Sequence, residues 1–316
     1  MNTRTLGKTG LRVSEIGFGG WAVGGNAFGN SYGGTDDAVS RAAMVRALEL
    51  GITLFDTADV YGYGHSEALL GEVLRDRPGP APTVVTKAGI NFYRRDDTLE
   101  QDWTPLALAH AVQQSLARLR RDTLDVFLLM NPLVEDLDRW KVWDTLDALK
   151  RAGKIRFAGV SVAEPADGVW LLENRLPIDV LEVAYSVFYQ GASVELLPLA
   201  QKRGVGVLAR EPLANGFLSG KYAADAVFED GDIRASLPRE YVSAMAETAG
   251  RLDFLKREGS RTLAQAALRF VLDDVRVASV VVGAKTPGQV EENIGATGVP
   301  RIDESERELA AGVFSE

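Results

Sequence analysis

Three residue types in this sequence could together transfer a proton to a carbonyl oxygen: a carboxylate, a phenol and an amine. Asp56 and Tyr61 lie close together in "FDTADVYG", and Lys87 ends the run "VVTK". A phenol with a pKa of about 10 is a poor acid at neutral pH, but a nearby ammonium favours the phenolate and lowers that pKa. A carboxylate beside the ammonium would keep it charged and in place, so that the phenol becomes a usable general acid.

Each of these residues also has an ordinary structural explanation. Asp56 could cap a helix or form a turn, Tyr61 could pack within a loop, and Lys87 could be solvated. Asn131 follows the apolar run "LDVFLLM" and precedes Pro132, where it could be a turn residue. The functional interpretation therefore depends on whether the fold brings these side chains together.

Short apolar runs alternate with helical patterns along the whole chain. Residues 35–50 and 105–120, for example, have apolar side chains at helical spacing. The apolar runs are residues 14–20, 52–58, 83–89, 124–131, 155–162, 179–186, 204–210 and 279–285. Alternation of strands and helices predicts a parallel sheet, and about eight such units match a closed (β/α)₈ barrel. An open doubly wound sheet is the alternative, but no GxGxxG motif joins a strand to a helix, since "GFGGWAVGG" has the wrong spacing.

Polar residues occur where the predicted strands end. In a barrel these ends meet on one face, which is where barrel enzymes carry their active sites. The residues are Asp56, Tyr61, Lys87, Asn131, Ser161, Arg210, Glu211, Gly283 and Lys285. A barrel would therefore gather the acid, the phenol and the amine on the same rim.

The composition limits the class of protein. The chain has 316 residues, 46% of them hydrophobic, and no cysteine. That length suits one large α/β domain or two ordinary ones, and without cysteine there are no disulfides and no thiolate chemistry. A net charge of -9 argues against a nucleic-acid surface, which needs clustered Lys and Arg. No stretch approaches the roughly 18 apolar residues of a membrane span, and no signal-peptide core is visible. We therefore expect a soluble, cytoplasmic protein.

Several long motifs occur in an order typical of one protein family. They are "LGKTGLRVSEIGFGGW", "ITLFDTADVYGYGHSEALLGEVL", "VVTKAG", "SLARLRRDTLDVFLL", "LKRAGKIRFAGVS", "PLANGFLSGKY" and "VVVGAKTPGQVEENIGA". With them the chain resembles a bacterial member of the aldo-keto reductase superfamily over nearly its whole length. The resemblance implies that residues 1–316 form a single (β/α)₈ barrel domain opened by a small N-terminal β-hairpin. It also implies that NADPH binds in an extended form without a Rossmann motif.

The resemblance implies an active site of Asp56, Tyr61, Lys87 and the residue at position 131. Family members usually have His at this position, whereas this chain has Asn131, as the β subunits of potassium channels do. A carboxamide can donate a hydrogen bond but cannot titrate, so Asn131 would orient the substrate and stabilise an oxyanion without acting as an acid. His65 and His110 lie in predicted helical segments and offer no substitute.

The same resemblance assigns residues to both ends of the cofactor. At the nicotinamide it implies Gly20, Trp21, Asp56, Asn131, Ser161, Glu182 and Arg210. Glu182 replaces a Gln that normally holds the carboxamide, and Arg210 replaces a stacking aromatic residue. Along the phosphates and the adenosine it implies Leu213, Ala214, Gly216, Lys221, Arg234, Gly283, Lys285, Gln289, Glu292 and Asn293. Lys285 would open a helix, where a cation suits a 2′-phosphate, so we expect NADPH rather than NADH.

The substrate is less defined by the sequence. Trp21, Tyr61, Phe92 and Tyr93 are expected to line its pocket, beside two long loops at residues 91–103 and 223–241. Three functions stay open. The first is an NADPH-dependent carbonyl reductase, and the second is a reductase of a C=C or C=N bond in a specialised metabolite or nucleotide-sugar. The third is a cofactor-binding regulatory subunit with little turnover. No metal, nucleic-acid or membrane partner is expected.

Overall fold

Eight parallel strands form a closed barrel, which confirms the predicted (β/α)₈ architecture. The computed structural model describes residues 1–26, 31–75, 79–93, 99–257 and 259–313. In their order around the barrel the strands are β3 (Ile16–Gly19), β4 (Leu54–Asp56), β5 (Thr83–Ala88), β8 (Leu124–Met130), β9 (Ile155–Ser161), β10 (Val180–Ala184), β11 (Gly206–Arg210) and β12 (Ser279–Gly283). β12 pairs with β3 and closes the barrel.

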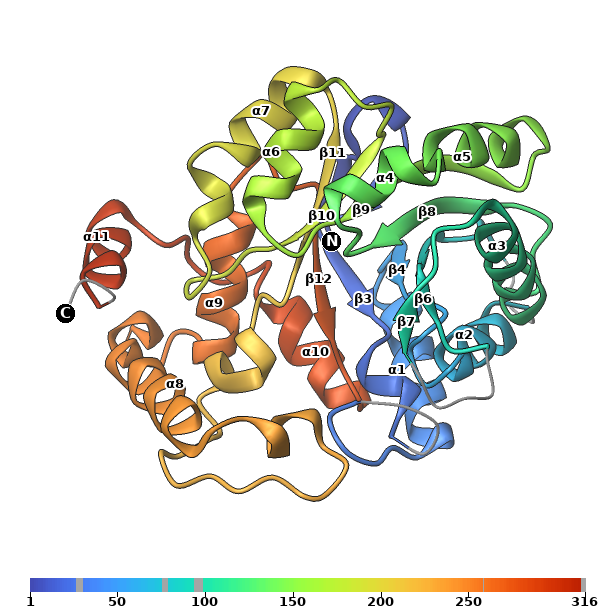
Figure 1. The fold of residues 1–316 in the computed structure, drawn as a ribbon. Coiled ribbons are helices and arrows are strands. Elements are labelled where there is room, and N and C mark those ends of the chain that lie inside the picture. Colours follow the sequence, from blue (N-terminus) through green and yellow to red (C-terminus); the bar gives the residue numbers. More distant parts are fainter. Residues whose placement is uncertain (27–30, 76–78, 94–98, 258, 314–316) are drawn as a thin grey trace.

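Helices surround the strands (Figure 1). They are α1 (Asp37–Glu49), α2 (His65–Arg75), α3 (Pro105–Leu119), α4 (Val134–Arg139), α5 (Val142–Arg151), α6 (Pro165–Glu173), α7 (Leu196–Arg203), α8 (Arg239–Arg251), α9 (Leu263–Leu272), α10 (Pro287–Gly295) and α11 (Glu304–Gly312). Their starts follow local chemistry. Thr104, for example, caps α3 by accepting from the backbone of Ala107, and Pro105 occupies the first turn, where its missing N–H costs nothing.

Among the described residues, two antiparallel strand pairs lie outside the barrel. The expected N-terminal hairpin consists of β1 (Thr3–Thr5) and β2 (Arg12–Ser14). The second pair, β6 (Ile90–Asn91) and β7 (Glu100–Gln101), lies in the predicted loop at residues 91–103. Residues 94–98 of that loop lie outside the described part of the chain. The predicted loop at residues 223–241 contains the short 3-10 helix η5 (Ile233–Ser236) and the start of α8.

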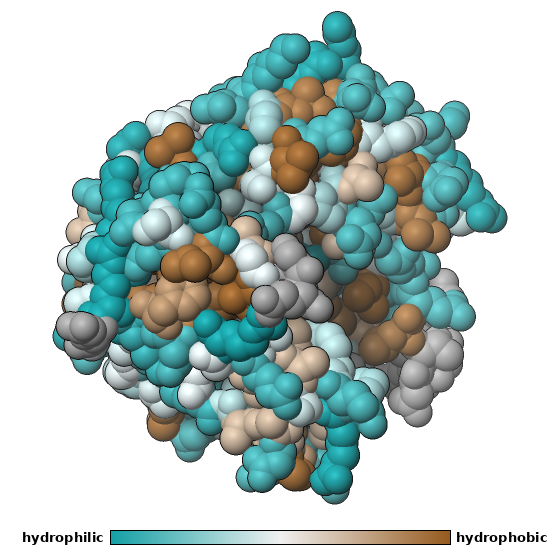
Figure 2. All heavy atoms as spheres, turned by 90° about the vertical axis from the view of Figure 1, so that its left-hand side faces the viewer, coloured by the Kyte–Doolittle hydropathy of each residue, from teal (hydrophilic) through white to brown (hydrophobic). Residues whose placement is uncertain are grey.

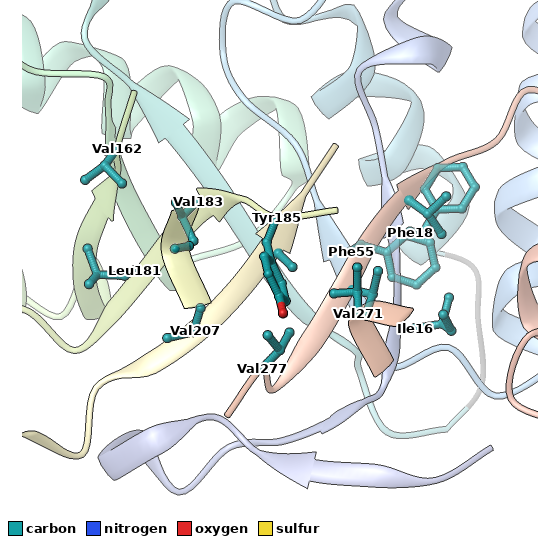
Figure 3. Close-up of a cluster of buried hydrophobic side chains, with 14 of the residues drawn as sticks. Ile16, Phe18, Phe55, Val162, Leu181, Val183, Tyr185, Val207, Val271 and Val277 are labelled. Atoms are coloured by element: carbon teal, nitrogen blue, oxygen red, sulfur yellow. The ribbon is translucent and has the colours of Figure 1, made fainter. Parts of the chain in front are cut away.

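Side chains alternate between the inside and the outside of the barrel with the two-residue period of a strand. Leu54, Val85, Leu128, Val180 and Leu208 belong to one buried cluster of inward-facing residues. Their outward-facing neighbours pack under the helices instead. Figure 3 shows part of this outer layer, in which Phe55, Leu181 and Val207 share a cluster with Val271 of α9. The next inward position on several strands is polar, and these polar residues form the site described below.

The hairpin covers the end of the barrel where the strands begin. Leu6, in its turn, is fully buried and joins the inward-facing cluster. Lys8 N donates to Gly204 O just before β11, and the guanidinium of Arg4 donates to Leu272 O and Val277 O before β12. The barrel is thus plugged at the end opposite to the polar residues.

We expect Leu6→Ala to lower the free energy of unfolding by about 2–3 kcal/mol, because it leaves a cavity under the plug. Urea unfolding of the purified variant would measure this. Turnover per folded molecule should stay at the wild-type value, since Leu6 lies at the opposite end from the site. Leu106→Ala is the control: Leu106 is 82% exposed, so its loss should change the unfolding free energy little. Equal effects of both substitutions would contradict the plug.

The outer surface offers little contiguous apolar area on the side that carries α8 and α11. Figure 2 shows this face as mainly hydrophilic, with apolar side chains in separate patches. In the described part of the chain, no helix has the length and hydropathy needed to cross a membrane.

Candidate active site

Asp56 and Lys87 form a buried ion pair at the carboxyl ends of two neighbouring strands. Asp56 follows Leu54 on the inward face of β4, and Lys87 follows Val85 on that of β5. Lys87 Nζ lies 2.6 Å from both carboxylate oxygens of Asp56 and 3.1 Å from Thr57 O. The ammonium is therefore fixed by three hydrogen bonds.

Tyr61 lies in the tight turn that joins β4 to α2. The turn is left-handed at Gly62, Tyr63 and Gly64, and Gly62 has no room for a side chain because a Cβ would lie 2.3 Å from Gly24 O. Lys87 Nζ lies 5.3 Å from the centre of the Tyr61 ring. Trp21 packs edge-on against the same ring at 4.8 Å between centroids. The predicted acid, amine and phenol are thus brought together.

The electrostatics of this group are set by burial and by opposing charges. Burial would lower the pKa of Lys87, but the charges of Asp56 and Glu182 outweigh it and raise the pKa, so the lysine is held as a cation. Burial raises the pKa of Tyr61 above its ordinary value. Lys87 lowers the pKa of Tyr61 as predicted, but burial and the two carboxylates outweigh it. Tyr61 is therefore a firmly protonated phenol in the free protein.

Asn131 follows the last residue of β8 in the left-handed region, with φ of 50°. Asn is among the few residue types that adopt this conformation without much strain. Its backbone is anchored, because Asn131 N donates to Ser161 O at 2.8 Å and Asn131 O accepts from Gln101 Nε2 at 2.7 Å. Asn131 Oδ1 is buried and has no hydrogen-bond partner among the described residues. Such an atom is costly unless a ligand satisfies it.

Glu182 also faces into the barrel, two residues after Val180 on β10. Its Oε2 lies 3.2 Å from Lys87 Nζ, and its Oε1 accepts from Ser161 Oγ at 3.2 Å. Oε2 makes this ion pair but no hydrogen bond in the described structure. Ser161 and Glu182 thus lie together as predicted, but Glu182 additionally belongs to the Lys87 cluster. Sequence reasoning did not predict this contact.

Arg210 ends β11 on the same rim. Its guanidinium pairs with Glu211 and donates to Val162 O at 3.1 Å. Gly20 lies directly after β3, where Gly20 N donates to Asp56 O at 2.7 Å. A Cβ at Gly20 would lie 2.6 Å from Ser66 Oγ, so only glycine permits this close approach.

The segment after β11 has a run of unusual backbone. Glu211, Ala214, Asn215 and Gly216 all have positive φ, although only the last is glycine. Left-handed non-glycine residues cost free energy and concentrate at ligand sites. Leu213 and Ala214 begin the 3-10 helix η4 (Ala214–Ser219), and Lys221 follows it as an exposed residue. The predicted pyrophosphate loop is therefore a strained and well-defined turn.

A second group of contacts links this turn to the segment before α1. Tyr32 OH donates to Asn215 Oδ1 at 2.8 Å. Lys285 Nζ donates to Tyr32 O and, at 3.3 Å, to Gly34 O. Lys285 N donates to Gln289 Oε1 at 2.7 Å. Burial lowers the pKa of Lys285, and the charge of Asp232 opposes this. Tyr32 and Asn215 carried no signal in the sequence.

The guanidinium of Arg234 donates hydrogen bonds to three neighbouring residues. Its Nε and Nη2 donate to the two oxygens of Asp232 at 2.9 and 2.6 Å. Its Nη1 donates to Tyr222 OH at 2.6 Å and to Asn215 O at 3.1 Å. Since a guanidinium has five N–H donors, Arg234 keeps one for a ligand. Asp232 was not predicted; it pairs with Arg234, and its charge also acts on Lys285.

The remaining predicted site residues are three for the cofactor and two for the substrate pocket. Gly283, Glu292 and Asn293 lie at the end of β12 and on α10, where Asn293 Nδ2 donates to Gly283 O at 3.3 Å. Phe92 packs in the apolar cluster that contains Tyr61 and Trp21. Tyr93 turns away: its hydroxyl donates to Asp59 and accepts from Arg118, and it lines a separate cavity of about 320 Å³.

Neither histidine reaches the site. His65 Nε2 lies 2.8 Å from Asp37 Oδ1 on α1, and the ring of His110 packs edge-on against Tyr93. The prediction that the two histidines offer no substitute at position 131 agrees with this geometry.

The structure is that of a (β/α)₈-barrel protein with a buried Asp56–Lys87–Tyr61 group at the carboxyl ends of its strands. The model of the Aldo/keto reductase family matches residues 15–311, and the chain belongs to this family. It is an oxidoreductase of the aldo-keto reductase type, and its family uses a nicotinamide cofactor.

Relatives with named activities support the family assignment. The chain is 29% identical to an NADH-specific methylglyoxal reductase of Escherichia coli (strain K12), covering 94% of both chains. Two solved structures are similar over almost their whole length. They are the aldo-keto reductase AKR11C1 from Bacillus halodurans in its holo form (29% identity, TM-score 0.80, 99% of this chain and 96% of that one) and the glycerol dehydrogenase AKR11B4 from Gluconobacter oxydans (28%, 0.81, 96% and 92%).

Proposed function

We propose that this protein is an NADPH-dependent oxidoreductase that reduces an aldehyde or ketone, with Tyr61 as the general acid. The observation that carries the proposal is the position of Lys87, which is buried between the carboxylate of Asp56 and the ring of Tyr61. A charged amine in this place has no packing role that an apolar residue would not fill better. Its presence is explained by chemistry at the phenol.

The reaction is a hydride addition followed by protonation. The bound dinucleotide would supply the hydride, with its electron pair, to the carbonyl carbon, and the π pair of the C=O bond would move to oxygen. Tyr61 Oη gives its proton to that oxygen, which completes the alcohol. Lys87 lowers the cost of the phenolate that results, and Asp56 holds Lys87. Asn131 Nδ2 is suited to donate a hydrogen bond to the same oxygen.

The residues present fit a nicotinamide dinucleotide. Asn131 Oδ1 and Glu182 Oε2 are buried without hydrogen-bond partners in the described structure, and both are acceptors suited to a carboxamide NH₂. The strained turn at Ala214–Gly216 and the cations Lys285 and Arg234 lie in order along the other end. This order supports an extended dinucleotide between the two groups.

The choice between NADPH and NADH depends on the charges near Lys285. Lys285 and Arg234 favour a 2′-phosphate, and burial of Lys285 strengthens any charge-assisted bond that it makes. Asp232 opposes them, because its carboxylate already neutralises Arg234. We favour NADPH since Lys285 Nζ has no acidic partner within ion-pair distance in the described chain and donates only to backbone carbonyls.

We expect Lys285→Ala to weaken NADPH binding about ten- to a hundredfold and NADH binding by less than about threefold, since only NADPH has the 2′-phosphate. Fluorescence titration of each cofactor would measure both dissociation constants. Lys202→Ala is the control, because Lys202 is an exposed lysine at the end of α7 and should change neither constant. Equal losses for both cofactors would show that Lys285 does not contact the 2′-phosphate.

A substrate panel tests the proposed function. Aldehydes, ketones, enones and imines would be offered with NADPH and with NADH, and cofactor oxidation followed at 340 nm. The proposal expects turnover of aldehydes or ketones, faster with NADPH. Tight cofactor binding with no turnover of any compound would favour a regulatory role and contradict the proposal.

A second candidate function is reduction of a C=C or C=N bond in a specialised metabolite or nucleotide-sugar. The observation that favours it is Asn131, a neutral amide with a left-handed backbone at the end of β8, which cannot act as an acid. An imine reaches the site already protonated, so its reduction needs less acid catalysis than that of a ketone. Faster turnover of imines or enones than of aldehydes in the panel would select this candidate.

A further inference from the structure

Glu182 puts a second carboxylate beside the catalytic lysine. Asp56 comes from β4 and Glu182 from β10, on different sides of the barrel interior. Lys87 Nζ lies 2.6 Å from Asp56 and 3.2 Å from Glu182. The three side chains are 4%, 1% and 1% exposed. One ammonium is therefore shared by two carboxylates in a space without bulk water.

Two ionised carboxylates around one ammonium would give the cluster a net negative charge. A single lysine cannot neutralise two buried carboxylates, and an excess buried charge is costly. Burial and then the charge of Glu182 raise the pKa of Asp56 well above its usual value, against the opposing charge of Lys87. Glu182 and Asp56 thus both form ion pairs with the ammonium of Lys87.

The two carboxylates and the lysine also affect the pKa of Tyr61. In the described structure, the charges with the largest effects on the phenol come from four different strands. Lys87 of β5 and Arg210 of β11 favour the phenolate, whereas Asp56 of β4 and Glu182 of β10 disfavour it. Arg210 is itself paired with Glu211, which weakens its effect. Removing Glu182 alone would leave Lys87 opposed by one carboxylate instead of two.

We propose that Glu182 is a positioning residue that holds part of the charge of Lys87 and thereby keeps Tyr61 in its proton-donating form. At a given pH, more of the protein then holds Tyr61 as the phenol that gives a proton to a carbonyl oxygen, and less holds it as the phenolate that takes a proton from an alcohol. In the reverse reaction the alcohol would lose its hydroxyl proton to a phenolate at Tyr61 and its hydride to the oxidised dinucleotide. Glu182 makes that phenolate scarce. The inference rests on the proposed role of Tyr61.

The experiment replaces Glu182 by its uncharged isostere. Glu182→Gln keeps the shape of the side chain and its contact with Ser161, so Tyr61 should ionise at a pH about 1–2 units lower than in the wild type. Absorbance at 295 nm would be titrated for the wild type and for Glu182→Gln. The same titration of Tyr61→Phe in each background isolates the Tyr61 signal by subtraction. This readout requires no turnover, so it stands whether or not the proposed reaction is found.

A second readout is the pH dependence of turnover in both directions. With 4-nitrobenzyl alcohol and NADP⁺, the pH at which kcat/KM for oxidation rises should fall by the same 1–2 units. Reduction of 4-nitrobenzaldehyde should lose activity at high pH earlier than in the wild type. A merely structural defect would lower both directions at every pH and shift neither profile.

Two further variants separate charge from structure. Glu182→Asp keeps the charge and should keep the titration of Tyr61 near that of the wild type. Glu67→Gln removes an equally buried carboxylate that pairs with Arg118 and does not contact Lys87, so it should leave the Tyr61 titration unchanged. Should Glu182→Gln not fold, Glu182→Met is the second uncharged variant. Ionisation of Tyr61 at the same pH with and without the carboxylate would overturn the inference.

Discussion

Tyr61→Phe is expected to lower carbonyl reduction by about a hundred- to ten-thousandfold, the usual contribution of a general acid. The phenol ring would still pack against Trp21 and lie near Lys87, so the fold and the NADPH affinity should be nearly unchanged. The loss should appear in kcat, because only the step that protonates the alkoxide is affected. Steady-state kinetics at 340 nm, together with a cofactor titration, would measure both quantities.

Tyr63→Phe is the matched control for this substitution. Tyr63 lies two residues later in the same turn, is 40% exposed and stacks on Phe92. Loss of its hydroxyl should leave turnover within about twofold of the wild type, as for most surface changes. Near-normal reduction of ketones by Tyr61→Phe would remove Tyr61 from the acid role. Retained activity on imines alone would instead favour the second candidate function.

Asn131→Ala is expected to lower turnover by about ten- to a thousandfold, by comparison with the loss of one oxyanion donor. The same change should destabilise the protein by about 1–2 kcal/mol, because alanine is strained at a left-handed position. Thermal unfolding separates the two effects, since turnover is compared only at temperatures where both proteins are folded. Wild-type turnover by Asn131→Ala on every substrate would mean that Asn131 only forms the turn before Pro132.

Asn131→Asp and Asn131→His test whether Asn131 stabilises an oxyanion in a carbonyl reductase or belongs to a site that reduces C=C or C=N bonds. Asp keeps the shape and tolerates the left-handed backbone, but its carboxylate would repel an oxyanion, so activity should fall further than in Asn131→Ala. His also tolerates this backbone and restores the residue that family members usually have. We expect Asn131→His to raise activity on simple aldehydes. A protein that reduces C=C or C=N bonds should lose activity on its own substrate with this change.

The barrel and the centre of the site could be predicted because both depend on short-range patterns. The two-residue period of a strand puts Leu54 and Asp56, or Val85 and Lys87, on the same inward face. Adjacent parallel strands then bring Asp56 and Lys87 together with no further assumption. The same reasoning, together with the family resemblance, places Ser161 beside Glu182 on neighbouring strands.

Contacts between distant segments could not be predicted. Tyr32 contacts both Asn215 and Arg234 because two irregular loops cross at the rim. No periodic pattern encodes such a crossing. The contact of Glu182 with Lys87 was missed for a different reason. The resemblance assigned Glu182 to the cofactor, and only the closed barrel shows that β10 faces β5 across the interior.

The left-handed backbone at position 131 also limits how this protein can diverge. Only glycine, Asn, Asp and His occupy such a conformation at little cost. Natural selection can therefore choose among four side chains at position 131: the hydrogen atom of glycine, the amide of Asn, the carboxylate of Asp and the imidazole of His. These four groups differ in charge and in proton donation far more than they differ in backbone preference. A lineage that accepts a substitution here changes its chemistry in one step while keeping its fold.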